Sequence, residues 1–270
     1  MSLLQVEMRR AMHRRVVWVL ISVALLGCVA AGIIAFVDSS GKTVAELRYA
    51  DELHPAVLAH WWVAHQYDGI VLIPAFFLLL GGMFGGAAVA GAEWRSNTIT
   101  TVLTWEPRRV RLHLARTAAC AVLAFVIALC LQILFLAALL PAVFGNGTTA
   151  GVDRQWWLSL ATVVGRTALL TSIAASLAVA LATLGRNTAF ALGVVFAWFA
   201  VIENLIRGLR PKWTPYLWGE NIGSVVQWRP DGGEFHRAPL LALVTIGVYA
   251  AVLITAATVA FQRRDIAGVS

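Results

Sequence analysis

Few residues in this chain have the type and spacing that catalysis or metal binding requires. The six histidines are His13, His54, His60, His65, His113 and His236. Of these, His54, His60 and His65 are six and five residues apart, so no two of them share a helix face as zinc ligands at i and i+4 would. Residues 40–43 resemble the end of a phosphate-binding loop, but Phe36 stands where that motif needs glycine. We therefore expect no catalytic residue, metal or cofactor on this chain.

The composition is that of a membrane protein. Of the 270 residues, 60% are apolar and 13% are charged, and the mean hydropathy is +0.78. Soluble domains have about 45–50% apolar and about 25% charged residues, and disordered chains are more polar still. The three cysteines, Cys28, Cys120 and Cys130, fall inside apolar runs and cannot form a disulfide framework.

Six apolar runs are long enough, or nearly so, for a helix to cross the hydrocarbon core, which takes about 20 residues. They cover residues 16–37, 69–92, 117–144, 158–184, 188–206 and 239–261. We expect an all-α, polytopic membrane protein in which residues 1–270 form a single transmembrane domain. Two of the runs contain a charge, Arg166 in the fourth and Glu203 in the fifth.

The distribution of charge predicts the orientation. The segments expected inside are 1–15, 93–116, 185–187 and 262–270, and together they hold twelve basic and four acidic residues, a net charge of +8. The segments expected outside are 38–68, 145–157 and 207–238, and they hold eight basic and nine acidic residues, a net charge of −1. By the positive-inside rule both termini are cytoplasmic, although 207–238 holds five of the outer basic residues.

The basic residues also indicate a source and exclude a function class. Among 21 of them only Lys42 and Lys212 are lysines, a bias typical of GC-rich bacterial genomes. We expect a multi-pass protein of the bacterial inner (plasma) membrane. The formal net charge of +7 is accounted for by topology, so we expect no nucleic-acid binding.

The N-terminal residues 2–15 alternate apolar and basic positions at helical spacing. Leu3, Leu4, Met8 and Met12 share one face, which predicts an amphipathic helix lying on the cytoplasmic surface of the membrane. The alternative is a disordered basic tail. Residues 25–28 resemble a lipoprotein cleavage box, but the chain stays apolar to Val37, so we expect an uncleaved span.

The segments expected outside contain short structured elements as well as loops. Residues 38–68 predict one or two short helices, with Trp61 and Trp62 in the aromatic belt of the membrane. Within the aromatic-rich segment 207–238, residues 216–228 could dip into the outer leaflet of the membrane as a broken or re-entrant hairpin, whose backbone must then be covered by protein.

The second span contains a cluster of glycines. Gly81 with Gly85, and Gly82 with Gly86, form small-xxx-small pairs, which let helices approach closely. So many glycines also favour a bend in this helix. The functional interpretation is a mobile helix interface, and the alternative is static packing.

The intramembrane charges Arg166 and Glu203 both fall in the outer half of their spans. Such charges usually face protein or water and pair with one another. We expect these two to pair or to share a polar network, alone or together with Asn204. In the functional interpretation they form an outer gate or contact the substrate. In the alternative interpretation they only stabilise the structure.

The inner loop after the second span predicts a short helix over 98–105. Ser96 or Asn97 can cap it, and Pro107 ends it. Its apolar positions are Ile99, Val102 and Leu103, and the basic residues Arg108, Arg109 and Arg111 follow it. An apolar face directed to the cytosol would suit docking into a groove of another protein. The alternative is a helix that rests on lipid headgroups.

This loop contains the pattern Glu93-x-Arg95-x-x-Thr98, followed by Leu103-x-x-x-Pro107-Arg108-Arg109. The pattern resembles the loop after span 2 in membrane (permease) subunits of ABC transporters of the ABC-2 type. The length, the six spans, the N-terminal helix and the aromatic-rich outer segment agree over essentially the whole chain. Asn97 departs from the family, which often has glycine there.

The resemblance implies that 98–105 is a coupling helix seated in a separate ATP-binding subunit. The residues implied in this coupling are Glu93, Trp94, Arg95, Thr98, Ile99, Val102, Leu103, Pro107 and Arg109. It also implies two ATP-binding subunits, which hold ATP and Mg²⁺, and a second permease subunit, identical or homologous. The cargo would be an exported amphiphilic, drug-like, lipid or peptide molecule.

Other functions remain open from the residues alone. An ion-coupled secondary transporter would favour inverted repeats and acidic residues near the membrane midplane, and only Glu203 is embedded, away from the midplane. A non-transporting membrane scaffold subunit would need none of these features. A membrane enzyme would need a catalytic constellation, and the spans contain none.

Overall fold

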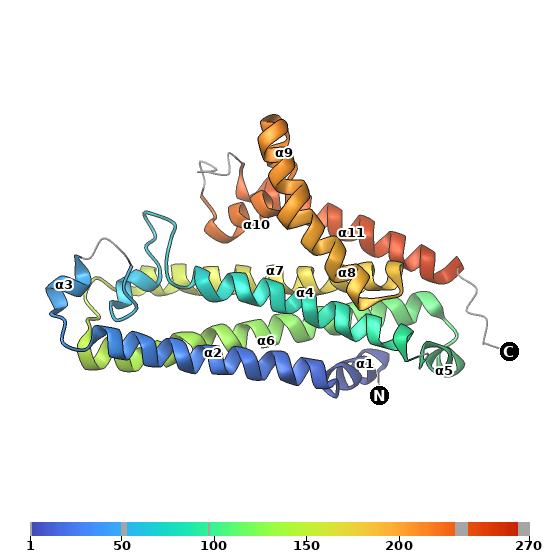
Figure 1. Cartoon of the computed structure of the whole chain (residues 1–270), viewed down its shortest axis with the longest axis horizontal. Coiled ribbons are helices and arrows are strands. Elements are labelled where there is room, and N and C mark those ends of the chain that lie inside the picture. The colour runs from blue at the N-terminus through green and yellow to red at the C-terminus, as the bar shows by residue number, and fades with distance from the viewer. Residues whose placement is uncertain (1, 50–52, 97, 230–236, 264–270) are drawn as a thin grey trace. The chain divides into compact units, whose positions relative to one another are not determined.

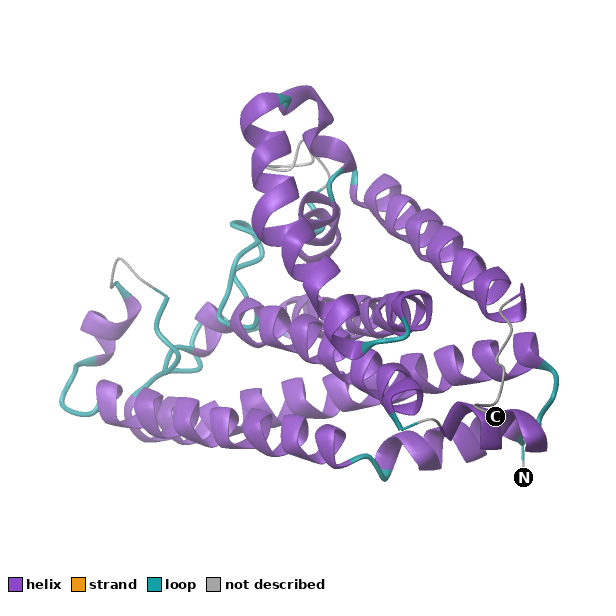
Figure 2. Ribbon diagram, turned by 45° about the vertical axis from the view of Figure 1, so that its right-hand side comes forward, coloured by secondary structure: helices purple, strands orange, loops and turns teal. Residues whose placement is uncertain are grey.

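A computed structural model describes residues 2–49, 53–96, 98–229 and 237–263, apart from the side chains of Thr100, Val102 and Trp105. Within these residues the secondary structure consists of helices joined by loops and turns, with two isolated bridges and no strand (Figures 1 and 2). The contacts divide the chain into two units. Unit 1 comprises Met1–Trp18, Leu79–Phe125 and Leu169–Ser270, and unit 2 comprises Val19–Leu78 and Val126–Ala168.

Six helical stretches are long and apolar enough to cross a membrane. They are α2 (Arg15–Ser39), α4 (Leu72–Arg95), α6 (Arg109–Asn146), α7 (Arg154–Gly185), the stretch Thr188–Leu209 and α11 (Pro239–Arg263). The all-helical class predicted from the sequence is therefore confirmed, and the six stretches have the length and composition that a multi-pass membrane protein requires.

The helices extend beyond the predicted apolar runs at several ends. The 38 residues of α6 begin at Arg109 instead of residue 117, and α7 begins at Arg154 instead of residue 158. At 1.5 Å per residue, α6 is about 57 Å long, well over the ~30 Å of the hydrocarbon core. The apolar run marks the thickness of that core, and polar residues continue the helix on either side of it.

The stretch Thr188–Leu209 is not a uniform α-helix. It consists of α8 (Thr188–Phe196), the π-helical segment η2 (Ala197–Ile202) and α9 (Glu203–Leu209). Nothing in the composition of the fifth apolar run predicts this change of helix type. The π-helical segment ends directly before Glu203, the charge singled out in that run.

In unit 2, the two loops expected outside form a folded cap. It contains α3 (Val44–Arg48) and the 3-10 helix η1 (Leu58–Trp61). The Leu58 N–H donates to the Thr148 carbonyl at 3.0 Å, and the Thr148 N–H donates to the Ala56 carbonyl at 3.1 Å. These bonds join the loop before α4 to the loop before α7.

The cap has its own aromatic core. Trp61 and Trp62 are 2% and 3% exposed, so they are buried in protein and do not lie in an aromatic belt as expected. The Trp61 indole N–H donates to the Pro55 carbonyl at 2.8 Å, and that of Trp156 donates to the Trp62 carbonyl at 2.7 Å. A buried indole usually has a hydrogen-bond partner for its N–H, and both of these do.

In unit 1, α4 packs closely on α7 through one of the two predicted glycine pairs. A Cβ added at Gly82 would lie 2.8 Å from the Thr171 carbonyl oxygen, and one at Gly86 would collide with that of Ala175. A Cβ at Gly81 would meet no heavy atom within 4 Å, and Gly85 is only partly buried. The helix α4 continues through all four glycines, so the Gly82–Gly86 pair serves close packing without interrupting it.

The segment 207–238 folds into short helices, as far as it is described. The 3-10 helix η3 (Pro211–Tyr216) is followed by α10 (Trp218–Gln227), which packs against α11. The Tyr249 hydroxyl donates to the Tyr216 carbonyl at 2.9 Å, and the ring of Tyr249 stacks on Trp218. One face of α10 is buried in this way, but Trp213, Tyr216 and Trp228 remain exposed, so protein does not cover the whole aromatic segment and its entry into the membrane stays a prediction.

Candidate functional site

The short helix α5 (Thr98–Trp105) has the bounds that the sequence predicts. It is set off from α4 by a turn, where the Ser96 hydroxyl donates to the Ala92 carbonyl at 2.8 Å and so extends the end of α4. Asn97, the other predicted cap, lies outside the described residues. Pro107 separates α5 from α6, which begins two residues later.

The apolar face of α5 faces the protein itself, contrary to the expectation that it points to the cytosol. Ile99 is 3% exposed and packs with Leu112 of α6 and Phe261 of α11. Trp94 and Leu103 pack against the same cluster. The first turn of α6 and the last turn of α11 offer this apolar surface, and burying Ile99 there removes it from water. The side chain of Val102 lies outside the description.

The exposed face of α5 is polar. Thr98, Thr101 and Thr104 recur at every third position and are exposed. Beside them Arg95 and Arg111 are also exposed, and Arg111 lies 3.5 Å from the Glu106 carboxylate. We call Thr98, Thr101 and Thr104 the threonine face. It is the part of α5 that another protein could contact.

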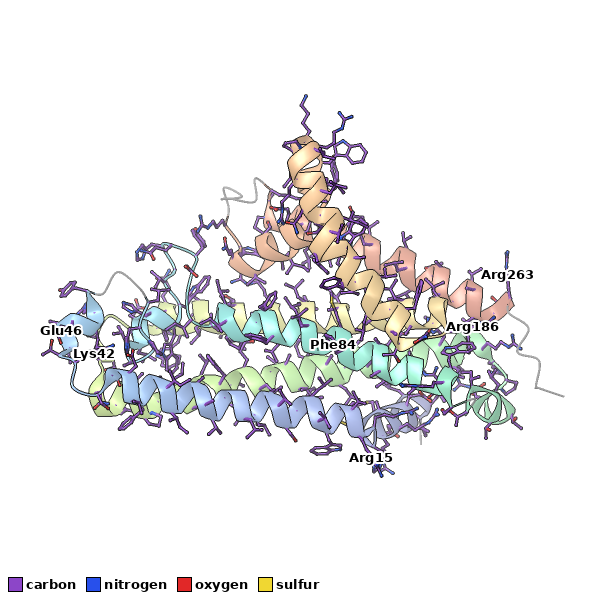
Figure 3. All side chains as sticks on the ribbon, in the orientation of Figure 1. Arg15, Lys42, Glu46, Phe84, Arg186 and Arg263 are labelled. Atoms are coloured by element: carbon purple, nitrogen blue, oxygen red, sulfur yellow. The ribbon has the colours of Figure 1, made fainter. Side chains whose placement is uncertain are left out.

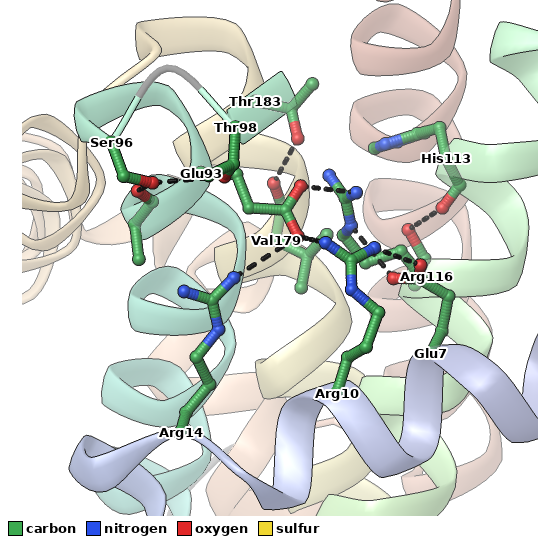
Figure 4. A network of polar contacts seen from close by, with 12 residues as sticks. Glu7, Arg10, Arg14, Glu93, Ser96, Thr98, His113, Arg116, Val179 and Thr183 are labelled. Atoms are coloured by element: carbon green, nitrogen blue, oxygen red, sulfur yellow. Dashed lines mark hydrogen bonds and ion pairs between the residues drawn. The ribbon is translucent and has the colours of Figure 1, made fainter. Parts of the chain in front are cut away.

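Glu93, at the end of α4, is buried in a group of five charges (Figure 4). Its carboxylate lies 2.9 Å from the Arg10 guanidinium, 3.3 Å from that of Arg14 and 2.5 Å from that of Arg116. Glu7 lies 2.6 Å from Arg10 and 3.3 Å from Arg116. We call these five residues the inner charge cluster.

The inner charge cluster ties three helices together at the base of α5. Glu7, Arg10 and Arg14 come from α1 (Leu3–Met12) and the turn after it, Glu93 from α4 and Arg116 from α6. Glu7, Glu93 and Arg116 are 4%, 1% and 2% exposed. Buried charges cost several kcal/mol each unless they are paired, and removing one partner leaves that cost uncompensated. The cluster therefore fixes α1 to the ends of α4 and α6.

The sequence contained a signal for this cluster. Glu7, Arg10 and Arg14 are at i, i+3 and i+7, a spacing that puts them on one stripe of a helix. The predicted face of Leu3, Leu4, Met8 and Met12 is not the one that α1 buries, because its buried residues are Glu7 and Ala11. Ser2 begins α1 with a capping box to Gln5, so a helix and not a disordered tail is observed.

Trp94 joins α5 to further elements of unit 1. Its ring packs edge-on against Phe261 at 6.1 Å, and the Arg186 guanidinium lies 5.4 Å from its ring centre. Figure 3 shows Arg186 and Arg263 at the end of unit 1 that carries α5. Arg109 donates to the Gln262 carbonyl at 3.4 Å. The segments predicted to lie inside thus meet around α5.

Arg166 and Glu203, the two charges expected within the membrane, each have partners within their own unit. The buried Glu203 carboxylate accepts from the Trp198 indole N–H at 2.9 Å and from the Gly219 N–H at 3.0 Å, and it lies 3.8 Å from Arg207. The Arg166 guanidinium donates to the Thr162 carbonyl at 3.1 Å. A pair between Arg166 and Glu203 would join the two units and stays a prediction.

Asn204, His54 and His60 also have partners. Asn204 donates to the Ala200 carbonyl at 3.0 Å. In the cap, His54 Nε2 lies 2.8 Å from the Asp38 carboxylate, and His60 Nδ1 accepts from the His54 N–H at 3.0 Å. Burial lowers the pKa of His60. Among the described residues no group of three His, Cys, Asp or Glu side chains could hold a metal ion.

Comparisons with known proteins identify no family for this chain. The chain matches no protein-family model, and no curated protein matches it in sequence.

Proposed function

We propose that this chain is the permease subunit of an ABC transporter of the ABC-2 type, located in the bacterial inner membrane, and that α5 is its coupling helix. One observation supports this most. The inner face of α5 packs against α6 and α11, while its threonine face is exposed. A helix held in this way can take up a displacement from a partner and pass it to the long helices.

In this proposal the threonine face contacts a cytoplasmic ATP-binding subunit that holds ATP and Mg²⁺. Closure of two such subunits displaces α5 in each of two permease subunits. Because packed interiors are dense and resist compression, Ile99 and Leu103 pass the displacement to Leu112 and Phe261. The inner charge cluster makes α1 follow the same movement. The chain itself hydrolyses no ATP.

The cargo belongs to the proposal as well. The resemblance of the inner loop favours export of an amphiphilic, drug-like, lipid or peptide molecule. The long helices carry few charges besides Arg166 and Glu203 between their ends, which favours a cargo with a large apolar part over a small polar solute.

The experiment co-expresses the tagged chain with the ATP-binding protein encoded beside its gene. Thr101→Trp adds bulk to the threonine face without touching the apolar cluster. We expect it to abolish co-purification and the stimulation of ATPase activity. Leu103→Asp is a poorer test, because Leu103 packs within the chain and its loss would also disturb the fold.

The matched control is Thr149→Trp, the same change at an exposed threonine of the outer cap. It should leave the complex and its ATPase activity intact. The proposal is wrong if Thr101→Trp also leaves both intact, or if Thr149→Trp abolishes both while Thr101→Trp does not.

A further inference from the structure

The cap of unit 2 contains an open cavity of about 590 Å³, which we call the outer cleft. Small-molecule sites usually measure about 300–1,000 Å³. The outer cleft lies between the loop before α4 and the start of α7. Its lining includes Arg48, His60, Trp62, Gln66, Gln155 and Trp156.

The walls of the outer cleft are held in place before any ligand binds. The Trp156 indole N–H donates to the Trp62 carbonyl at 2.7 Å, which ties one wall to the other. The backbone bonds of Thr148 to Ala56 and Leu58 join the same two loops a second time. A site that needs no ordering on binding retains more of its contact energy as affinity.

Hydrogen-bond donors predominate among the charged and titratable groups of the cleft. Arg48 is exposed, and no described carboxylate forms an ion pair with it. His60 Nδ1 accepts from the His54 N–H, so the proton of the neutral ring is on Nε2. Asp153, the acid in the described lining, already accepts from the Trp156 backbone N–H at 2.7 Å at the start of α7.

We propose that the outer cleft binds an amphiphilic organic anion. Its phosphate or carboxylate group pairs with Arg48 and accepts from His60. Its apolar part lies against the exposed ring of Tyr49 and the partly exposed Leu53, since Trp62 and Trp156 are buried and offer it little surface. Arginine suits this role because its planar guanidinium can bind two oxygens of such a group at once. The inference is independent of the proposed transport function. The phosphate could belong to a soluble molecule or to a lipid headgroup at the outer surface.

The experiment measures binding of 1-naphthyl phosphate to the purified full chain in phosphatidylcholine nanodiscs by isothermal titration calorimetry. We expect one saturable site per chain, and no binding of the cation 1-naphthylmethylammonium. Arg48→Gln should raise Kd about tenfold or more, because a hydrogen bond to a charged group is lost. Arg154→Gln is the matched control, since Arg154 is exposed nearby but does not line the cleft, and it should leave Kd unchanged.

Competition with dihexanoyl-phosphatidylglycerol distinguishes the two sources. Displacement of the probe identifies a lipid headgroup as the ligand, and lack of displacement identifies a soluble anion. The proposal is overturned if the cation binds as well as the anion, if no binding is detected, or if Arg48→Gln changes nothing. It is also overturned if replacing Asp51 and Glu52, next to the cleft in sequence but outside the described residues, by Asn and Gln weakens binding.

Discussion

Two buried carboxylates, Glu93 and Glu203, are satisfied in different ways. Glu93 lies within ion-pair distance of three arginines, two of them from the N-terminal helix and the turn that follows it. Glu203 accepts from an indole N–H and a backbone N–H, and its arginine is 3.8 Å away. The partners of Glu93 are up to 83 residues away along the chain, and those of Glu203 at most 16.

The difference shows which part of the chain depends on charge for its tertiary structure. The inner charge cluster joins elements that are distant in sequence, so α1 depends on it for its position beside α5. Glu203 joins α9 to the first turn of α10, where the positive end of the helix dipole also favours a carboxylate. Its contribution is therefore local.

The largest effect is expected from Glu93→Gln. The change leaves Arg116, which is 2% exposed, paired with Glu7 alone, and it should lower the free energy of unfolding by about 3–5 kcal/mol. Urea unfolding of the chain in detergent micelles measures it. The control Glu106→Gln removes a partly exposed ion pair and should cost about 1 kcal/mol or less. Equal losses in the two variants would contradict the role of the cluster.

Glu203→Gln should have a smaller effect, about 1–3 kcal/mol in the same assay. The amide oxygen of glutamine can still accept from Trp198 or Gly219, but not from both as fully as the carboxylate does. A loss as large as that of Glu93→Gln would remove the distinction between the two sites.

Arg14→Gln is expected to cost about 1 kcal/mol or less. Arg14 is the more distant of the two partly exposed arginines, and Glu93 keeps Arg10 and Arg116 as partners. The same unfolding curves test this. If Arg14→Gln is as damaging as Glu93→Gln, Glu93 needs all three arginines.

The smallest effect is expected in the cap of unit 2, where the His60 ring accepts a hydrogen bond from the uncharged His54 N–H. Its pKa is lowered by burial, so the stability it contributes is present above about pH 6.5 and is lost as the pH falls through its folded-state value. Protonation removes the acceptor for the His54 N–H. The protection factors of residues 53–71, in which the slower intrinsic exchange in acid is corrected for, should therefore fall on acidification, more than those of α7. An equal fall in both would exclude His60 as the cause.

The sequence predicted the features of the fold that depend on the length of an apolar run or on a nearby residue that ends a helix. The six long helices follow from the apolar runs, and α5 has its predicted bounds because Pro107 ends it. The observed helix ends differ from the predicted ones because polar residues such as Arg109 and Arg154 continue the helices beyond the apolar runs.

What the sequence did not predict depends on contacts between distant segments. Ile99 turns inward because Phe261, 162 positions later, provides an apolar partner. The resemblance implied a coupling role for Glu93 but did not indicate its described partners, which are in α1, α6 and the turn after α1. Trp61 and Trp62 are buried because the loop before α7 closes over them.

The most direct test of the proposed coupling is a cross-link from the threonine face. Thr101→Cys, in a Cys130→Ala background because Cys130 is the exposed native cysteine, is labelled with a photo-reactive group in native membranes. The proposal predicts one main cross-linked partner, a protein with the G-x-x-x-x-G-K-S/T loop of an ATPase, and none from Thr149→Cys in the same background. Absence of an ATPase at Thr101, or its equal capture at Thr149, would contradict the proposal.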